Sequence, residues 1–488
     1  MANFVEKDVQ ALESISKESI ITAEHAGNVA AILNRYFNEH ERNQTFQKVE
    51  KLISQRFSDI IVHFDLDNGT QFASAFYLFC YTLTNIETGY TRVQNSIYTH
   101  IAIPFQSWVK DKGTMVEALM SAVPEGDDYV FICRRAAVNG AYAPGKSVYT
   151  YAEALLARGE SVWIIALWSS DEKFIELKKR YNKLRISVLF TSSLEVNLIS
   201  IIEILKLAEP KVILTETEFE LPSILGILNS KIPMIYLAQG FHNLPWYDLI
   251  GINDNLDPAH TGRSKKDFFD LPVWVARDIL APEVDLNAIN QTKIELGIDK
   301  NDFIIGTFAR MEKFTEPFLN FICRCLDTEK SLKVILAGPN DTQLVEEKLK
   351  QFSNEGRAIV LPFVDVNIVG HCIDLGIDTF PLHSGYSVLE LMAKNIPVLA
   401  KKDKFLGSLI SDRLPDALKA TEDDLIALIT DLANNPKLLD TFKLKTNEFM
   451  ILHDKSEKFL KVLDDSIKRV QQNLRSDKFS HSELHNGL

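Results

Sequence analysis

The chain has 488 residues, 46% of them hydrophobic, and a formal net charge of −13 at pH 7. This length exceeds what one hydrophobic core supports and predicts two or three domains. The acidic balance argues against a nucleic-acid partner and against a broad basic face that docks on an anionic membrane, because both depend on an excess of Lys and Arg.

The sequence shows no targeting segment and no cysteine framework. No apolar run is long enough to span a bilayer, and the first residues, MANFVEKDVQALESISK, lack the apolar centre of a signal peptide. The five cysteines are scattered, and Cys323 and Cys325 have no second pair at zinc-ligand spacing. We therefore expect a cytoplasmic protein with reduced thiols, no metal site and no integral membrane segment.

Residues 1–125 are predicted to form a mainly helical N-terminal domain. In EHAGNVAAILNRYFNEH (24–40), apolar residues recur at helical spacing. The run DIIVHFDL (59–66) is a strand candidate, so an α+β arrangement is the alternative. No motif in this part indicates chemistry, and acceptor recognition and oligomer formation are both open as its role.

A first Rossmann-like domain is predicted over 126–285. From Asp128 onward, strand-like apolar runs alternate with helical segments, which predicts a parallel sheet with helices on both faces. The runs are YVFIC (129–133), SVWIIAL (161–167), ISVLF (186–190), KVILTE (211–216) and PMIYLAQ (233–239). Residues 252–292 contain the polar stretch NDNLDPAHTGRSKKD, which we expect to be a loop where the chain crosses to the next domain.

A second Rossmann-like domain is predicted over 286–450, because the alternation of strands and helices resumes there. Its strand-like runs are DFIIGTF (302–308), LKVILAG (332–338), AIVLP (358–362), LGIDTF (375–380) and PVLA (397–400). Helices are expected over 422–434 and 436–471, and residues 451–488 form a C-terminal helix and polar tail. Two such α/β domains enclose a cleft between the carboxyl ends of their strands, where ligands bind in these folds.

The segment DLGIDTFPLHSGYSVLELMAKNIPVLA (374–400) predicts a buried strand, a small-polar turn and a helix, in that order. The turn places Ser384, Gly385 and Ser387 at the helix start, where unpaired backbone N–H groups and the positive end of the helix dipole suit a phosphate. Glu390 follows within the first turns, where a carboxylate can accept hydrogen bonds from ribose hydroxyls. Together these features indicate a nucleotide site.

This layout resembles the GT-B glycosyltransferases. The run DTFPLHSGYSVLELMAKNIPVLA (378–400) is similar to the sugar-nucleotide turn of the O-GlcNAc transferase and bacterial protein N-glycosyltransferase family. Related retaining enzymes carry an acidic residue at the place of Leu382, and its absence favours the O-GlcNAc-transferase-like branch. The resemblance covers roughly 128–400 and is firmest over 302–400. Three more segments support it: IPMIYLAQGFHNLPWYDLIGINDNLDP (232–258), FIIGTFARMEKFTEPFLNFICRCL (303–326) and SLKVILAGPND (331–341).

The resemblance implies a donor site in the second domain. Lys313 falls where the family places a lysine on the nucleotide diphosphate, and Arg310 lies on the same loop. A lysine and helix N–H groups can stabilise a departing diphosphate without a metal, so we expect no cofactor beyond the UDP-sugar substrate. Contacts to the nucleotide are expected at Ser384, Gly385, Tyr386, Ser387, Glu390, Gly338, Phe363 and Asn367.

The first domain is expected to carry the acceptor side of the cleft. His242 follows Gln239-Gly240-Phe241 at a strand end, and its imidazole can orient the donor or accept a proton from the acceptor. Glu216 and Glu218 are alternative proton acceptors, ranked lower because nothing in the sequence fixes their direction.

A competing motif lies at GAYAPGKS (140–147), which has P-loop spacing. In a P-loop, Lys146 would reach the terminal phosphates and Ser147 would hold magnesium. Residues 134–139 separate the motif from its strand and Pro144 interrupts it, so we favour Gly145 and Lys146 as residues that line the cleft.

The sequence therefore predicts a GT-B fold and a metal-independent glycosyltransferase that transfers a hexose or N-acetylhexosamine from a UDP-sugar to a protein or glycan acceptor. Three alternatives stay open: a retaining GT-B transferase for polysaccharide or glycolipid synthesis, a non-catalytic GT-B-like partner subunit, and a P-loop NTPase. Neither the sugar, the acceptor nor the anomeric outcome follows from the residues.

Overall fold

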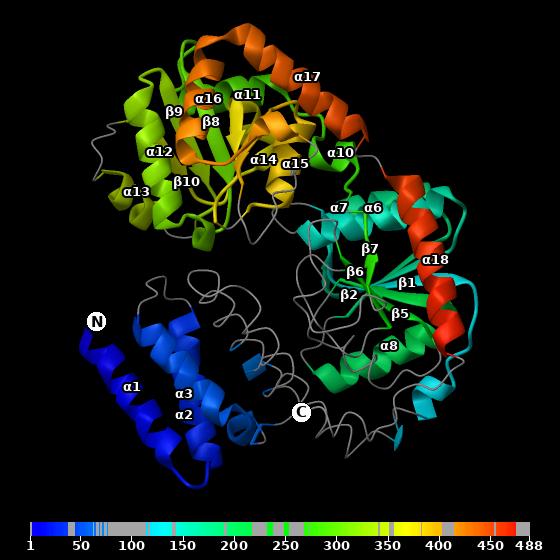
Figure 1. The fold of residues 1–488 in the computed structure, drawn as a ribbon. Coiled ribbons are helices and arrows are strands. Elements are labelled where there is room, and N and C mark those ends of the chain that lie inside the picture. The colour runs from blue at the N-terminus through cyan, green and yellow to red at the C-terminus, as the bar shows by residue number, and fades with distance from the viewer. Residues whose placement is uncertain are drawn as a thin grey trace.

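A helical N-terminal part and two α/β domains follow one another along the chain (Figure 1). The structure is a computed structural model. It describes residues 2–37, 44–61, 63–64, 68, 71–72, 76, 114–115, 118–138, 143–189, 193–216, 232–237, 248–252, 268–272, 274–339, 342–350, 356–381, 383–402, 414–452 and 455–474.

Helices form the best-described part of the N-terminal domain: α1 (Ala2–Lys17), α2 (Ala23–Phe37) and α3 (Gln44–Ile61). Their apolar stripes meet in one buried cluster that includes Leu12 and Phe57. The strand predicted at 59–66 is wrong, because its first residues are the end of α3. Ile53, Phe57 and Ile60 are buried at i, i+4 and i+7, so this apolar run continues a helical stripe.

The first α/β domain is built on a seven-stranded parallel sheet of order β3-β2-β1-β4-β5-β6-β7. The central part of each long strand is apolar because helices cover both faces of the sheet. Tyr129 and Phe131 pack with α6 and α7, whereas Val130 and Ile132 pack with α8. The strands are β1 (Asp128–Ala136), β2 (Val162–Ser170), β3 (Leu184–Val188), β4 (Pro210–Thr215), β5 (Met234–Leu237), β6 (Leu249–Ile252) and β7 (Phe268–Asp270). The helices are α6 (Ala143–Ala157), α7 (Glu172–Arg180) and α8 (Leu194–Ala208).

The second domain holds a six-stranded parallel sheet of order β10-β9-β8-β11-β12-β13. The chain runs outward from β8 to β10 and then returns to β11 on the other side of β8, so the order reverses between β8 and β11. Such a switch point opens a crevice at the carboxyl ends of the two strands. The strands are β8 (Phe303–Phe308), β9 (Leu332–Ala337), β10 (Ala358–Leu361), β11 (Leu375–Ile377), β12 (Val398–Lys401) and β13 (Leu418–Lys419). The helices are α11 (Leu286–Glu295), α12 (Glu316–Thr328), α13 (Thr342–Lys350), α14 (Val366–Val369), α15 (Tyr386–Ala393), α16 (Glu422–Asn434) and α17 (Pro436–Leu452), with 3-10 turns at η3 (Met311–Lys313), η4 (Gly370–Cys372) and η6 (Pro415–Ala417).

Each predicted strand of the two sheets is present, with small shifts at its ends. The short strands β6, β7 and β13 were not predicted, and the expected loop over 252–292 also contains α11. The single helix expected over 436–471 is two helices, α17 and α18 (Ser456–Leu474).

Helix α18 returns to the first domain and packs against α6 and β7 (Figure 1). The ring of Phe459 stacks on that of Tyr151 at 4.3 Å, and Arg158 donates to Asp464 at 2.7 Å. The C-terminal helix is therefore part of the first domain's helical layer, although the chain reaches it from the second domain.

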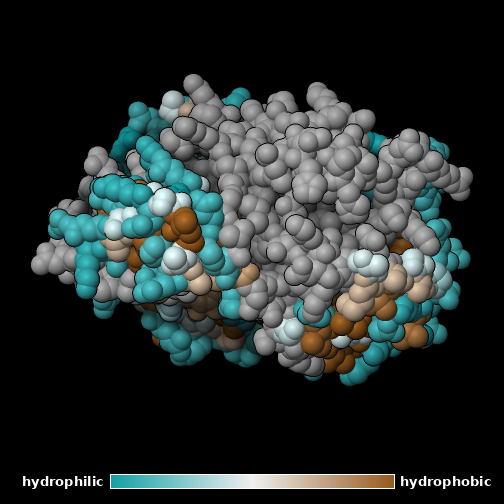
Figure 2. All heavy atoms as spheres, turned by 90° about the horizontal axis from the view of Figure 1, so that it is seen from below, coloured by the Kyte–Doolittle hydropathy of each residue, from teal (hydrophilic) through white to brown (hydrophobic). Residues whose placement is uncertain are grey.

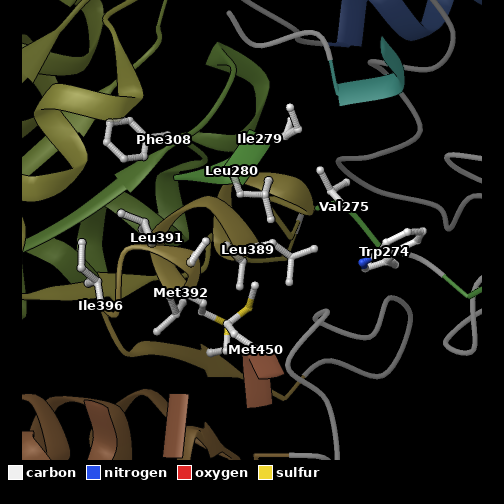
Figure 3. Packing of buried hydrophobic residues seen from close by; sticks show 14 of the residues in the cluster. Trp274, Val275, Ile279, Leu280, Phe308, Leu389, Leu391, Met392, Ile396 and Met450 are labelled. Atoms are coloured by element: carbon white, nitrogen blue, oxygen red, sulfur yellow. The ribbon is translucent and has the colours of Figure 1, made fainter. Parts of the chain in front are cut away.

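A linker between β7 and α11 contains α10 (Arg277–Leu280) and packs against α15. Figure 3 shows Leu280 of this linker beside Leu389 of α15, and both side chains are buried in the cluster that runs through the two domains. Arg277 Nε also donates to the carbonyl of Ala393, at the last residue of α15. The linker therefore fixes α15 to the junction between the domains.

The outer face of α8 carries two exposed apolar residues, Val196 and Leu207, exposed by 49% and 74%, together with the charged pair Glu203 and Lys206. Figure 2 shows apolar residues, in brown, gathered on the side of the molecule where α8 lies in Figure 1. Among the residues that the structure describes, no helix is long and apolar enough to cross a bilayer.

Candidate functional site

The predicted phosphate-binding residues meet at the switch point of the second sheet. Arg310 follows β8 and Lys313 ends the 3-10 turn η3 behind it, while the small-polar turn follows β11. Lys313 Nζ donates to the carbonyl of His383 at 2.6 Å, a contact between residues 70 positions apart. The structure thus brings Lys313 to the predicted turn, and it places Arg310 at the mouth of the same crevice with an exposed side chain.

A buried aspartate that we did not predict as a site residue folds this turn. Asp378, 1% exposed, accepts the backbone N–H of Ser384 at 2.6 Å through Oδ1. Its Oδ2 lies 2.9 Å from Nδ1 of His383, and Thr379 Oγ1 lies 2.8 Å from Ser384 Oγ. The loop therefore doubles back on the end of β11, so that α15 begins close to the strand. An acidic residue directly after an apolar strand was the available signal in the sequence.

Helix α15 begins without a side-chain cap among the described residues. Its N-cap is Gly385, with φ +63° and ψ −120°, a conformation that L side chains rarely adopt. The hydroxyl of Ser387 turns back to the carbonyl of Ser384 at 3.2 Å. The N–H of Val388 donates to the carbonyl of Gly385 at 3.1 Å. The start of α15 therefore offers the positive end of a helix dipole without a side-chain cap, a setting that suits a phosphate.

The backbone conformation at Gly338 and the close approach of a neighbouring turn both require glycine at this position. It follows β9 with φ +109°, and a Cβ there would lie 2.5 Å from the carbonyl oxygen of Ala309. Glycine therefore allows the turns after β8 and β9 to approach each other. A contact between Gly338 and the nucleotide stays a prediction.

The loop after β10 lines a cavity of about 320 Å³ between the domains. Phe363, 63% exposed, and Asn367 both line it, and their contact with a base stays a prediction. Lys146 and Lys173 of the first domain and Asp278 of the linker lie on the facing wall. A larger cavity of about 520 Å³ lies against α17 and is lined by none of the predicted site residues. The smaller cavity is lined by Lys146, Phe363 and Asn367 but not by Lys313 or the turn before α15, so we assign to it only the base side of the candidate site.

Two contacts join α6 of the first domain to α15 of the second. Lys146 Nζ forms an ion pair with Glu390 Oε1, with the two residues 5% and 7% exposed. Ser147 Oγ lies 2.6 Å from the hydroxyl of Tyr386. Gly145 precedes them on α6 and is buried. The lysine and serine of the P-loop-like motif therefore contact the other domain, and a role for Lys146 in a ligand site stays a prediction.

Lys394, at the end of α15, is another buried cation that we did not predict. Its Nζ donates to the carbonyl of Leu280 in the linker at 2.5 Å and to that of Glu390 at 3.1 Å. Burial lowers the pKa of Lys394 from its usual 10.5 to about 8, an effect that the Glu390 carboxylate opposes and the Lys146 charge reinforces.

The acceptor side is described only in part. His242 and Glu218 lie outside the described residues. Glu216 is 5% exposed and its Oε1 accepts the backbone N–H of Arg134 at 3.0 Å, which fixes its direction at the end of β4.

An aromatic and basic group, absent from our predictions, lies at the carboxyl ends of β1 and β2. The guanidinium of Arg134 lies 3.8 Å from the ring centre of Trp168, and that of Arg135 lies 5.1 Å from it. Trp168 is 44% exposed, so its ring remains accessible beside the two cations. The part of the chain that the structure describes contains no cluster of His, Cys, Asp or Glu suited to a metal ion.

Known structures share this architecture. The chain is similar to an O-GlcNAc transferase mutant of Thermobaculum terrenum, with a TM-score of 0.57 and 11% identity over 97% of this chain and 99% of that chain. It is similar to a glycosyltransferase of Rickettsia africae, with a TM-score of 0.53 and 15% identity over 70% of this chain and 100% of that chain. No protein-family model and no curated protein sequence matches it. The predicted GT-B fold is confirmed; at these identities the likeness concerns the fold.

Proposed function

We propose that the protein is a glycosyltransferase that binds a nucleotide-diphosphate sugar at the carboxyl edge of its second sheet. One observation carries the proposal: Lys313 reaches the turn that leads into α15, whose start no described side chain caps, and Glu390 lies one turn further along that helix. An ammonium group and the positive end of a helix dipole suit a diphosphate, and a carboxylate suits ribose hydroxyls. The GT-B fold, shared with a glycosyltransferase, supports this assignment.

The chemistry follows from where charge develops. When the bond between the anomeric carbon and the diphosphate oxygen breaks, negative charge grows on the diphosphate. Lys313, Arg310 and the N–H groups at the start of α15 stabilise that charge. The acceptor proton passes to a base on the first domain, for which His242 and Glu216 are the candidates.

We propose uridine as the nucleoside, on the character of the interdomain cavity. Phe363 offers an exposed ring on which a base can stack, and the Asn367 amide offers a hydrogen-bond donor and an acceptor. For the acceptor, we propose a group on a protein or a glycan that has both an apolar face and a negative charge. Such a group could stack on the exposed ring of Trp168 and pair with Arg134 or Arg135 beside it.

Calorimetric titration with UDP tests the donor site. We expect binding by the wild-type protein and an affinity at least about 10-fold lower in Lys313→Met, because the variant loses a charge-assisted contact to the diphosphate. Lys350→Ala on α13, a lysine whose side chain is 75% exposed, is the matched control and should bind UDP like wild type. Absence of heat at millimolar UDP would contradict the proposal.

Transfer activity then separates the candidate functions. Incubation with UDP-hexoses and UDP-N-acetylhexosamines should release UDP, and Lys313→Met should lower the rate by about 10²–10³-fold. Magnesium-dependent ATP binding that is lost in Lys146→Ala but kept in Lys313→Met would instead support a P-loop NTPase. UDP binding without turnover would support a non-catalytic partner subunit.

A further inference from the structure

Helix α15 presents one side to the first domain and the linker. Tyr386, Glu390 and Lys394 follow one another at intervals of four residues, which places them on one face of the helix. Each makes a bond across the domain junction: Tyr386 to Ser147, Glu390 to Lys146, and Lys394 to the Leu280 carbonyl. The carboxylate that we assign to ribose is therefore held by a residue of the other domain.

The Lys146–Glu390 pair is buried, so its two partners depend on each other. Loss of either partner from a buried ion pair leaves an uncompensated buried charge, which strongly destabilises the protein. A nucleotide that displaced Lys146 from Glu390 would incur part of this cost. A nucleotide that joined the pair would not, because an ionised carboxylate offers about four lone-pair sites on two oxygens, and Lys146 contacts only Oε1.

We infer that Lys146 is a positioning residue for the nucleotide donor: it fixes the Glu390 carboxylate through Oε1 and leaves the other oxygen to accept the ribose hydroxyls. This inference rests on the proposed function. It means that the ribose part of the donor site is completed by the first domain, so the site is whole only while α6 and α15 are in contact.

The test compares UDP with 2′,3′-dideoxy-UDP, which keeps the base and the diphosphate but lacks both hydroxyls. We expect Lys146→Met to weaken UDP binding by about 10–100-fold and dideoxy-UDP binding by less than about threefold, since only the ribose contact depends on Glu390. Lys146→Arg should restore most of the preference for UDP. Lys178→Met on α7, an exposed lysine outside the cavity, is the control and should retain both affinities.

Lys146→Met alone leaves Glu390 buried without its cation, and this could unfold the protein. A double variant that also neutralises Glu390 separates such an effect from a loss of UDP binding. Lys146→Met combined with Glu390→Gln should bind UDP as weakly as Glu390→Gln alone, which shows that Lys146 acts through Glu390. Circular dichroism of each variant confirms that it is folded.

Three results would overturn the inference. Tighter UDP binding by Lys146→Met would mean that the lysine competes with the nucleotide. An equal loss of affinity for UDP and dideoxy-UDP would mean that it acts on the diphosphate or on the fold as a whole. Unchanged affinity for both nucleotides would mean that Lys146 plays no part in binding the donor. Failure of the wild-type protein to bind UDP would be a different result, because it overturns the proposed function itself.

Discussion

At the scale of single residues, two glycines of the site are required for different reasons. Gly338 leaves room for the neighbouring turn, since a Cβ would meet the Ala309 carbonyl. Around Gly385 there is open space within the described residues, and only its φ of +63° demands glycine. A substitution at Gly385 therefore changes the backbone at the start of α15 and does not create a collision.

Gly385→Ala should lower the free energy of unfolding by about 1–2 kcal/mol and weaken UDP binding by more than about 10-fold, because the alanine strains the turn that positions the first N–H groups of α15. Gly297→Ala is a matched control, since Gly297 has φ +64° and open space but lies after α11, away from the site. It should cost similar stability and leave UDP affinity intact. Chemical denaturation and calorimetry measure the two effects, and equal affinity losses in both variants would refute this account.

The buried Lys394 makes stability depend on pH with a defined sign. Its pKa of about 8 in the folded protein lies below the usual 10.5, so between these values the unfolded chain binds more protons. Stability from this residue therefore rises with pH from about 8 to about 10.5, by up to about 3 kcal/mol. The difference in unfolding free energy between wild type and Lys394→Met isolates this effect from other titrating groups. A difference that stays flat over this pH range would refute it.

At the scale of elements, Asp378 anchors the turn between β11 and α15 to the end of the strand. We expect Asp378→Ala to lower the free energy of unfolding by about 1–3 kcal/mol, because the half-buried N–H of Ser384 loses its acceptor. UDP affinity should also fall by more than about 10-fold. Thr421→Ala removes the N-cap of α16, far along the chain from this turn, and should cost about 1 kcal/mol without a change in UDP affinity. Retained affinity in Asp378→Ala would show that the turn forms without this anchor.

The sequence predicted elements well where the apolar pattern was long. The runs that became β1, β2, β8 and β9 are mainly apolar over five to seven residues and bounded by helices, so composition and length agree. Strands β7 and β13 have three and two residues, too short to carry a pattern. The strand predicted at 59–66 was wrong because a buried helix end and a buried strand have similar apolar compositions.

The candidate site was predicted in its local parts and not in its long-range ones. The small-polar turn, Glu390 and Lys313 each carry a motif that the resemblance identifies. The partners of these residues carry no such motif. Nothing in the sequence pairs Lys146 with Glu390, because that contact joins residues 244 positions apart. Lys394 and Trp168 were missed for the same reason, since their roles come from burial and from neighbours on other elements. Asp378 bonds to residues only five and six positions away, and its place directly after an apolar strand was a signal that we did not use.

At the scale of the whole molecule, the first domain includes a helix from the far end of the chain. Phe459→Ala on α18 should lower the free energy of unfolding by about 3–5 kcal/mol, because a ring that is 1% exposed and stacked on Tyr151 leaves a cavity. Lys461→Ala on the exposed side of α18 is the control and should stay within about 0.5 kcal/mol of wild type. Denaturant titration measures both. A loss below about 1 kcal/mol in Phe459→Ala would show that α18 contributes little to the first domain.

The chain also passes between the domains twice, once through the linker that contains α10 and once between α17 and α18. A rigid body attached to another at two separate points keeps a single easy motion, rotation about the line through those points. Sliding and twisting of one domain across the other are opposed by both connections. We therefore expect any separation of α6 from α15 to be mainly a rotation about one axis, so that Lys146 meets Glu390 again when the domains close.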